Sequence, residues 1–205
     1  IPQAAWELVR VCELEDRMDA IVAALEGRFT YPMFVKPAGT GSSVGVSKAG
    51  NREQLKAALT AAGRYDSKIL VEEFIKGREI EVAVMGNDNP VASICGEIDS
   101  GADFYDYDAK YITDTSTAYI PARIPEDLQN RIREAAVRVF KAVGCQGLSR
   151  VDFFATEDGK LVFNEINTIP GFTSISMYPK LFTASGISYS RLIDRLLELA
   201  LEAGK

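Results

Sequence analysis

Residues 150–167, RVDFFATEDGKLVFNEIN, carry the clearest local structural signal of this chain. Two apolar-rich runs, at 151–155 and 161–166, flank the dipeptide Asp158-Gly159. Asp-Gly between two strand-like runs is a strong local signal for a β-hairpin. The stretch therefore predicts two antiparallel strands joined by a tight turn.

A two-residue loop in this hairpin would bring two carboxylates together. Asp152 would face Glu165, and Arg150 would face Asn167, with all four side chains on one face. Like charges directly opposite one another destabilise strand pairing, whereas Mg²⁺ or Mn²⁺ is well suited to carboxylate and amide oxygens. Arg150 adds a fixed cation for a phosphate or an oxyanion. The alternative is a solvated face whose carboxylates pair with Arg150 or Lys160.

The composition excludes several functional classes. With 205 residues, of which 47% are hydrophobic, the chain can form one large domain or two small ones that share a site. Its formal net charge of -6 argues against a nucleic-acid or anionic-membrane surface. The chain has no histidine, which excludes Ser-His-Asp and Cys-His catalysis and histidine-ligated metals. The chemistry must rest on Lys, Arg, carboxylates and metal.

The cysteines and the apolar pattern indicate the compartment. Cys12, Cys95 and Cys145 are odd in number and form no CxxC pair, so we expect neither a disulfide framework nor a zinc site. This usage fits a reducing compartment, the cytoplasm. No run of 18 apolar residues predicts a membrane span. The chain begins at Ile1 without an initiator Met, so we expect it to be a portion of a longer protein.

A glycine-rich loop follows a short apolar strand at 33–37, which carries Lys36 near its end. Residues 38–45, AGTGSSVG, include small residues that let the backbone direct N–H groups at an anion, and the hydroxyls of Ser42 and Ser43 add donors. The loop is not a Walker A motif and does not match GxGxxG. A Gly/Ser loop is more often a plain turn, but the lysine on the preceding strand favours phosphate binding.

The rest of the pattern predicts an α+β protein. Asn51 and Gln54 resemble a capping box that opens a helix to about Ala62. Other expected elements are a strand and helix in 3–25, antiparallel strands at 68–74, 78–85 and 91–98, and helices at 125–144 and 188–203. The apolar positions of the last two helices are Leu128, Ile132, Val139, Val143, Leu192, Ile193, Leu196 and Leu199.

Residues 99–119 have no periodic pattern and are rich in polar and aromatic side chains. A loop of this length in a compact domain is usually a lid or disordered. Tyr105, Tyr107 and Tyr111 favour an ordered lid, and Lys110 among them is a candidate phosphate contact.

Five stretches together resemble the ATP-grasp ligases, and within them the D-alanine:D-alanine ligases of bacterial cell-wall synthesis. In order, they are FVKPAGTGSSVGVSK, ILVEEFIKGREIEVAV, FYDYDAKY, GCQGLSRVDFF and LVFNEINTIPGFTSISMYPKLF. The resemblance runs from about Tyr31 to the C-terminus. It implies an ATP-grasp fold, in which two α+β subdomains with antiparallel sheets grip ATP. The expected parts are a leading strand and helix (1–32), a central ATP-binding subdomain (33–98), an omega-type lid loop (99–119) and a C-terminal catalytic subdomain with the metal hairpin (120–205).

The resemblance also implies roles for single residues. Metal ligands for two Mg²⁺ (or Mn²⁺) ions would be Asp152, Glu165 and Asn167. ATP would be bound by Lys36, Ser42, Ser43 and Lys110 at the phosphates, by Glu72, Glu73, Phe74 and Ile75 as the hinge against adenine, by Glu79 at the ribose, and by Asn164. The catalytic groups would be Arg150, the Gly171 N–H, Lys110 and Tyr111. The carboxylate of the second substrate would be held by Ser176 and the Met177 N–H, in a site that also includes Arg150.

The activity implied is ligation of two D-alanines through an acyl phosphate, with a homodimer expected for the full-length protein. Family members carry an additional N-terminal domain that binds the first D-alanine, and no stretch here corresponds to it, so we expect this chain alone to bind ATP but to ligate poorly. The alternatives are a D-alanine:D-serine or D-alanine:D-lactate ligase and a non-catalytic nucleotide-binding module. Two features favour D-alanine over D-lactate as the second substrate: the lid contains no histidine, and Met177 follows Ser176. The same features exclude D-serine less firmly.

Overall fold

The computed structural model describes residues 1–41, 43–99 and 117–204. The described chain divides into two compact units. The N-terminal unit contains residues 4–75, and the C-terminal unit contains residues 1–3, 76–99 and the chain from Thr117 onward. The division after Ile75 differs from the boundary at residue 98 expected from the sequence, because strands 77–86 and 91–99 belong to the sheet of the C-terminal unit.

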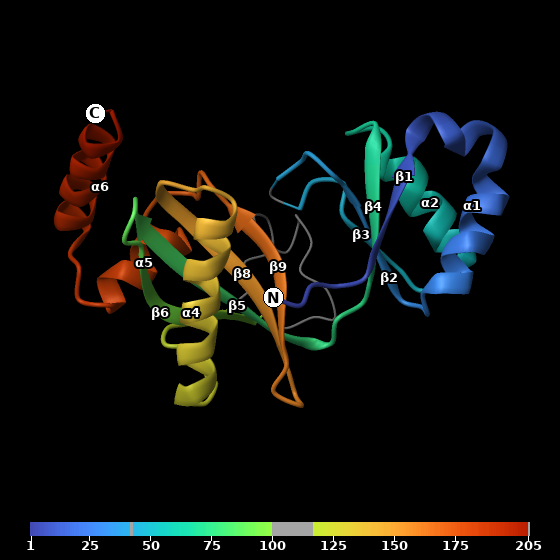
Figure 1. The fold of residues 1–205 in the computed structure, drawn as a ribbon. Coiled ribbons are helices and arrows are strands. Elements are labelled where there is room, and N and C mark those ends of the chain that lie inside the picture. Colours follow the sequence, from blue (N-terminus) through green and yellow to red (C-terminus); the bar gives the residue numbers. More distant parts are fainter. Residues whose placement is uncertain (42, 100–116, 205) are drawn as a thin grey trace. The chain divides into compact units, whose positions relative to one another are not determined.

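The N-terminal unit is a four-stranded antiparallel sheet with two helices (Figure 1). Its strand order is β1-β4-β2-β3, and α1 and α2 pack with one face of the sheet in a single core. Its elements are β1 (Trp6–Arg10), the short 3-10 helix η1 (Val11–Glu13), α1 (Leu14–Arg28), β2 (Met33–Pro37), β3 (Ser47–Ala49), α2 (Arg52–Ala62) and β4 (Lys68–Glu73).

Asn51 begins α2 as predicted. Its Oδ1 accepts a hydrogen bond of 3.0 Å from the N–H of Gln54, which satisfies one of the free donors at the helix start. The side chain of Gln54 accepts from the N–H of Gly50 at 2.7 Å rather than from that of Asn51, so the expected reciprocal pair is shifted by one residue. The cap and the helix are confirmed.

The C-terminal unit is a five-stranded antiparallel sheet with helices on both faces (Figure 1). Its strand order is β7-β6-β5-β8-β9. Its elements are β5 (Gly77–Gly86), β6 (Val91–Asp99), β7 (Thr117–Tyr119), α4 (Glu126–Ala142), β8 (Gly147–Thr156), β9 (Leu161–Asn167), α5 (Met177–Ala184) and α6 (Tyr189–Ala203). The predicted pairing of 78–85 with 91–98 is confirmed, but that of 68–74 with 78–85 is wrong, because β4 and β5 lie in different sheets.

Two cores hold the C-terminal unit together. Side chains from one face of the sheet, among them Ile80, Val82 and Phe153, pack with α4. From the other face, Ala83 and Met85 pack with α5 and α6. Alternation along β5 therefore places successive residues in different cores, as the two-residue period of a strand requires.

Two of the apolar helix positions that were expected in the core are exposed. Val143 follows the last residue of α4 and is 56% exposed. Ile193 is 37% exposed, because Leu192 and Leu199 are the residues that α6 buries. Helix α5 was not predicted at all. None of the described helices is long and apolar enough to span a membrane.

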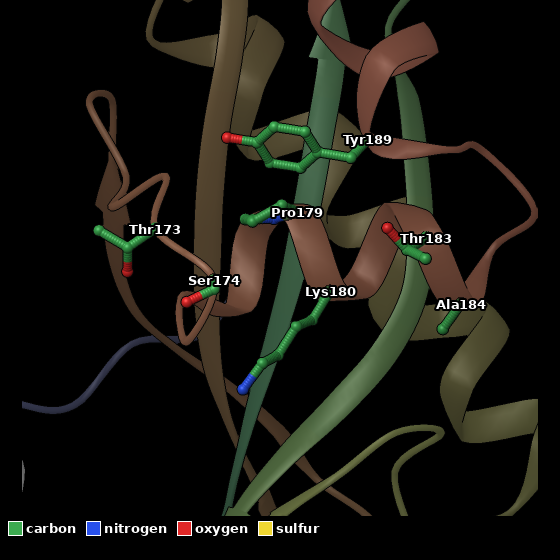
Figure 2. A pocket seen from close by; sticks show the side chains of 7 residues that line it. All are labelled: Thr173, Ser174, Pro179, Lys180, Thr183, Ala184 and Tyr189. Carbon is green, nitrogen blue, oxygen red and sulfur yellow. The ribbon is translucent and has the colours of Figure 1, made fainter.

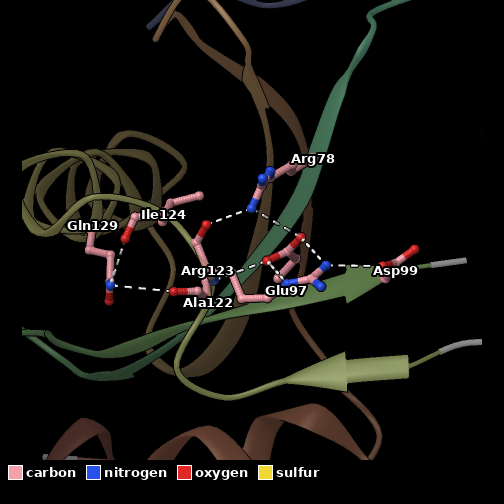
Figure 3. A network of polar contacts seen from close by, with 7 residues as sticks. All are labelled: Arg78, Glu97, Asp99, Ala122, Arg123, Ile124 and Gln129. Carbon is pink, nitrogen blue, oxygen red and sulfur yellow. Dashed lines mark hydrogen bonds and ion pairs between the residues drawn. The ribbon is translucent and has the colours of Figure 1, made fainter.

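A polar network joins β6 to the segment that follows β7 (Figure 3). Glu97 is 3% exposed, and its carboxylate accepts hydrogen bonds from the Arg123 backbone N–H at 3.0 Å and from its guanidinium at 2.8 and 3.1 Å. The same guanidinium donates to Asp99 at 2.9 Å, and Arg78 lies 3.6 Å from Glu97. The free-energy cost of burying the Glu97 carboxylate is therefore offset by its contacts with two arginines.

Candidate functional site

The two strands of the hairpin pair in the predicted register at Arg150 and Asp152, although the turn between them differs from the prediction. Its turn is longer than two residues: Gly159, with a φ of 75°, donates its N–H to the Thr156 carbonyl at 3.0 Å, and pairing starts at Ala155 with Leu161. A register shift between Asp152 and Phe153 then leaves Asn164 as an extra residue on β9. The bulge compensates for the longer turn.

Because of this compensation, the four predicted residues occupy the expected positions. Asp152 pairs with Glu165, and Arg150 pairs with Asn167. Val151 and Phe153 pack with α4, so Arg150 and Asp152, which alternate with them on β8, face the opposite side of the sheet. The structure thus brings together the side chains predicted to bind metal and to stabilise negative charge.

Glu81 is a further member of this face that the sequence reasoning missed. It pairs with Asp152 from β5, so that Glu81, Asp152 and Glu165 form one row across three neighbouring strands. Glu81 is 3% exposed and Asp152 is 1% exposed. A signal was present in the sequence, since Glu81 interrupts an apolar run in a strand that has both faces buried.

Arg150 lies among these carboxylates. Its Nε and Nη2 donate to the two oxygens of Asp152 at 2.8 and 2.7 Å, a fork-like contact, and its Nε lies 3.3 Å from Glu81 Oε1. Burial by itself would lower the pKa of Arg150, but the charges of Asp152 and Glu81 outweigh it and raise that pKa. Pairing of a hairpin carboxylate with Arg150, which the alternative interpretation expected, therefore occurs, whereas Lys160 pairs with Asp158 at 2.7 Å.

The donor set can hold a cation only if other ligands complete the shell. In the part of the chain that the structure describes, no three or more His, Cys, Asp and Glu side chains are placed to hold a metal ion by themselves. Asp152, exposed Glu165 and the amide of Asn167 supply oxygens alone, which suits a hard cation that also binds phosphates. Arg150 occupies two of the roughly four lone-pair positions of Asp152 and leaves the others. The residues therefore fit Mg²⁺.

Lys36 lies on the sheet face of the N-terminal unit that faces away from α1 and α2. Met33 and Val35 are buried in the core with these helices, so Phe34 and Lys36 project from the opposite face. The ammonium of Lys36 is 2.7 Å from Glu72 Oε1. Two predicted nucleotide ligands are thus in direct contact.

An aromatic cluster lies on the same unit. Phe74 stacks on Phe34 with ring centroids 5.8 Å apart, and the ammonium of Lys48 lies 4.8 Å from the centre of the Phe74 ring. Glu73 is occupied locally, since its carboxylate accepts from the Ala5 N–H at 2.8 Å. The predicted hinge therefore has an aromatic platform at Phe74 and a structural contact at Glu73, and Ile75 follows at the end of the unit.

The glycine-rich loop is tightly folded. The N–H of Gly39 donates to Asp66 at 2.6 Å, and the hydroxyl of Thr40 donates to the Val44 carbonyl at 3.0 Å. The backbone N–H of Lys68 and that of Gly39 lower the pKa of Asp66 despite its partial desolvation. Ser43 has a φ of 59°, in the left-handed region that non-glycine residues adopt rarely. Ser42 lies outside the described residues.

The predicted substrate residues gather at the start of α5. A Cβ added to Gly171 would lie 2.8 Å from Ser176 Oγ, and that hydroxyl accepts from the Thr173 N–H at 3.0 Å. Ser176 precedes α5, so the N–H of Met177 is among the helix donors without an intrahelical partner. Gly171, Ser176 and Met177 therefore form one local group.

A cavity of about 300 Å³ has in its lining Thr173, the hydrogen-bond partner of Ser176 (Figure 2). Its lining comes from the loop before α5 and from helices α5 and α6, and consists of Thr173, Ser174, Pro179, Lys180, Thr183, Ala184 and Tyr189. It shares no lining residue with the predicted substrate group. Glu79 lies elsewhere, on β5 opposite Phe154. The predicted lid residues Lys110 and Tyr111, with Tyr105 and Tyr107, lie outside the described residues.

The sequence model of the family described as "D-ala D-ala ligase C-terminus" matches residues 1–198. The D-alanine--D-alanine ligase of Acetivibrio thermocellus is 56% identical over 203 residues, which are 98% of this chain and 54% of that protein. The ligase of the same name from Deinococcus radiodurans is 53% identical, over 98% of this chain and 60% of that protein. The chain thus spans about half the length of the curated relatives it matches.

Solved structures give the same result. The VanG D-Ala:D-Ser ligase from Enterococcus faecalis is similar with a TM-score of 0.86 and 42% identity, over 97% of this chain and 57% of that one. The D-alanine-D-alanine ligase from Coxiella burnetii is similar with a TM-score of 0.83 and 37% identity, over 99% of this chain and 53% of that one. The similarity extends over both compact units.

Proposed function

Because the chain belongs to the family of D-Ala-D-Ala ligase C-terminal domains, we propose that it is the nucleotide-binding and metal-binding part of an ATP-dependent ligase that joins two D-alanines. The observation that carries this proposal is the hairpin face, on which Asp152 pairs with Glu165 beside Arg150 and Asn167. A cation site beside a fixed arginine suits a reaction in which phosphate charge is transferred.

The proposed nucleotide ligands come from both units. Lys36 contacts the ATP phosphates in place of its contact with Glu72, and Phe74 offers its ring to adenine. Glu79 binds the ribose hydroxyls. The remaining proposed ATP ligands are Ser42, Ser43, Glu72, Glu73, Ile75, Lys110 and Asn164.

The metal ligands in this proposal are Asp152, Glu165 and Asn167. When bound, Mg²⁺ supplies positive charge that neutralises the phosphate oxygens during transfer. Asp152 is buried and held in place by Arg150, whereas Glu165 is exposed. The proposed site therefore combines a buried carboxylate with one at the protein surface.

The proposed chemistry proceeds in two steps. The carboxylate of the first D-alanine takes the terminal phosphoryl group and becomes an acyl phosphate, and the amine of the second D-alanine then displaces the phosphate. Arg150 and the Gly171 N–H stabilise the oxyanion, assisted by Lys110 and Tyr111. Ser176 and the Met177 N–H hold the second carboxylate, where the start of α5 favours negative charge.

The product of this reaction, D-alanyl-D-alanine, serves peptidoglycan synthesis. Three free cysteines, Cys12, Cys95 and Cys145, support a reducing compartment, the cytoplasm. The proposed partners are the small molecules ATP and D-alanine, with neither nucleic acid nor membrane, and a homodimer for the complete protein.

A D-alanine:D-serine ligase is the second candidate, because one similar structure is an enzyme of that description. The apolar Met177 beside Ser176 suits a methyl group, yet an apolar pocket discriminates against an added hydroxyl only by a factor of about 100. D-serine is therefore the closest competitor for the second subsite.

The test is ADP release by the complete ligase that contains this chain, at pH 7, with D-alanine, D-serine and D-lactate present together. We expect ADP release to require D-alanine and the main product to be D-alanyl-D-alanine. Predominant D-alanyl-D-serine would favour the second candidate. ATP binding without ADP release under any of these conditions would indicate a non-catalytic nucleotide-binding module.

A further inference from the structure

Glu81 is buried on the face of the C-terminal sheet that carries Arg150 and Asp152, and none of the roles proposed above uses it. It pairs with Asp152 across β5 and β8, while Ala83 pairs with Arg150. Glu81 is therefore diagonal to Arg150, a separation that long side chains can bridge. The bridge is present, with 3.3 Å between Arg150 Nε and Glu81 Oε1.

Among the described side chains, Arg150, Asp152 and Glu81 form a group with one positive and two negative charges. One guanidinium, that of Arg150, lies between two buried carboxylates, those of Asp152 and Glu81. Burying a carboxylate is costly unless it is paired, so sharing one arginine between two carboxylates is an expensive way to stabilise a sheet. Asp152 by itself already occupies both donors of a fork-like contact.

We propose that Glu81 is a positioning residue: its carboxylate shares the guanidinium of Arg150 and thereby leaves Asp152 with negative charge for a divalent cation. Without Glu81, the full positive charge of Arg150 would face Asp152. With Glu81, that charge is divided, and the three side chains together carry one net negative charge. The inference rests on the proposed function, since it explains how one aspartate serves both an arginine and a metal ion.

The first measurement is Mn²⁺ binding to the 205-residue chain with a non-hydrolysable ATP analogue, followed by electron paramagnetic resonance. We expect Glu81→Gln to weaken Mn²⁺ binding about tenfold. Glu81→Asp, which keeps the charge but shortens the side chain, should also weaken it. Glu97→Gln is the matched control, because Glu97 is equally buried and arginine-paired in the same sheet but away from Arg150, and it should leave Mn²⁺ binding unchanged.

A double-mutant comparison separates action through Arg150 from a direct effect of charge. In an Arg150→Met background, adding Glu81→Gln should change Mn²⁺ binding by less than about twofold, since the group through which Glu81 acts is gone. An equal loss with and without Arg150 would mean that Glu81 acts on the metal directly, and no loss in either background would mean that it does not act. Either result overturns the proposal.

The second measurement follows the Arg150 Nε–H signal by nitrogen-15 nuclear magnetic resonance, without metal or nucleotide. We expect Glu81→Gln to shift or broaden this signal and Glu97→Gln to leave it in place. An unchanged signal in Glu81→Gln would overturn the proposal. If the wild-type chain bound no Mn²⁺, the proposed metal site would fail, and this signal would decide separately whether Glu81 positions Arg150.

Discussion

Lys36 has two competing partners in this account, a carboxylate in the protein and the phosphates of a nucleotide. Its ammonium lies 2.7 Å from Glu72 in the structure. We expect Lys36→Ala to weaken ATP binding by about 1.5 to 3 kcal/mol, the contribution of a charge-assisted contact, and to change AMP binding much less. Calorimetric titration with both nucleotides measures this difference.

Lys68→Ala is the control for that experiment. Lys68 is an exposed lysine on β4, and its removal should leave both affinities unchanged. An equal loss of ATP and AMP affinity in Lys36→Ala would show that Lys36 does not contact the phosphates.

The two hairpin carboxylates should respond differently to neutralisation. Asp152 is buried and bonded to Arg150, whereas Glu165 is exposed. We expect Glu165→Gln to weaken MgATP binding with little change in the free energy of unfolding, and Asp152→Asn to lower both. Urea unfolding and calorimetry on the same preparations measure the two effects. Wild-type MgATP affinity in both variants would contradict their role as metal ligands.

At the scale of elements, the hairpin shows what a sequence can and cannot predict. The Asp-Gly dipeptide located the turn, and the apolar-rich runs on either side of it located both strands. The pairing of Asp152 with Glu165 is confirmed, but it was derived from a two-residue loop, and that loop length is wrong. A longer turn and the bulge at Asn164 cancel each other, and neither has a local sequence signal that fixes its place.

Predictions for other parts of the chain missed for related reasons. Helix α5 follows an irregular segment rich in Pro and Gly, and its eight residues are too few to show a clear helical period. Ile193 was expected in the core together with Leu192, Leu196 and Leu199. These three leucines follow the i, i+4, i+7 spacing of one helix face, whereas Ile193 lies about 100° around the helix from Leu192 and stays partly exposed. Glu81 was missed although it interrupts an apolar run, because Glu79 and Glu81 alternate with Ile80 and Val82 in the way that is typical of a strand with one solvated face.

The link between β6 and the segment after β7 should be sensitive to acid. Burial tends to raise the pKa of Glu97, but the hydrogen bonds and charges of Arg123 outweigh burial and hold that pKa below its ordinary value of 4.5. A lowered folded-state pKa means that ionised Glu97 stabilises the fold above pH 4.5, and that this contribution is lost as the pH falls through the lowered value.

We therefore expect Glu97→Gln to reduce the free energy of unfolding at pH 7, and the difference from the wild type to shrink below pH 4.5. Glu157→Gln, at an exposed carboxylate of the hairpin turn, is the control and should show no such pH dependence. Urea unfolding at several pH values measures both. A difference that stays constant from pH 7 to acid would show that the charge of Glu97 is not what stabilises this link.

For the whole molecule, the α+β ATP-grasp fold predicted from the five stretches is confirmed by the similarity to solved D-alanine ligase structures. The compact units divide after Ile75, whereas the expected ATP-binding subdomain extended to residue 98. The short connection around Gly77 suggested that β4 and β5 pair with each other, whereas the chain changes sheets between Glu73 and Gly77. Short connections predict neighbouring strands in most folds, so only contacts far apart in sequence, such as those of β5 with β8, reveal the change.

The candidate site was predictable to the extent that its residues are polar in otherwise apolar strands. Arg150, Asp152, Glu165 and Asn167 were found in this way, and their shared face is confirmed. The contacts among them were not predictable, because the fork-like contact of Arg150 with Asp152 depends on rotamers and on the neighbouring strand β5. Their roles toward nucleotide and metal remain predictions.

Whether the hairpin carboxylates bind a metal ion together with ATP is measured by calorimetric titration of the 205-residue chain with ATP, in the presence of Mg²⁺ and again with Mg²⁺ removed by a chelator. We expect ATP to bind with Mg²⁺ and binding to weaken by at least about tenfold without it, because the carboxylates of Asp152 and Glu165 repel the phosphates when no cation lies between them. Equal ATP affinity with and without Mg²⁺ would show that these carboxylates do not hold a metal ion for the nucleotide.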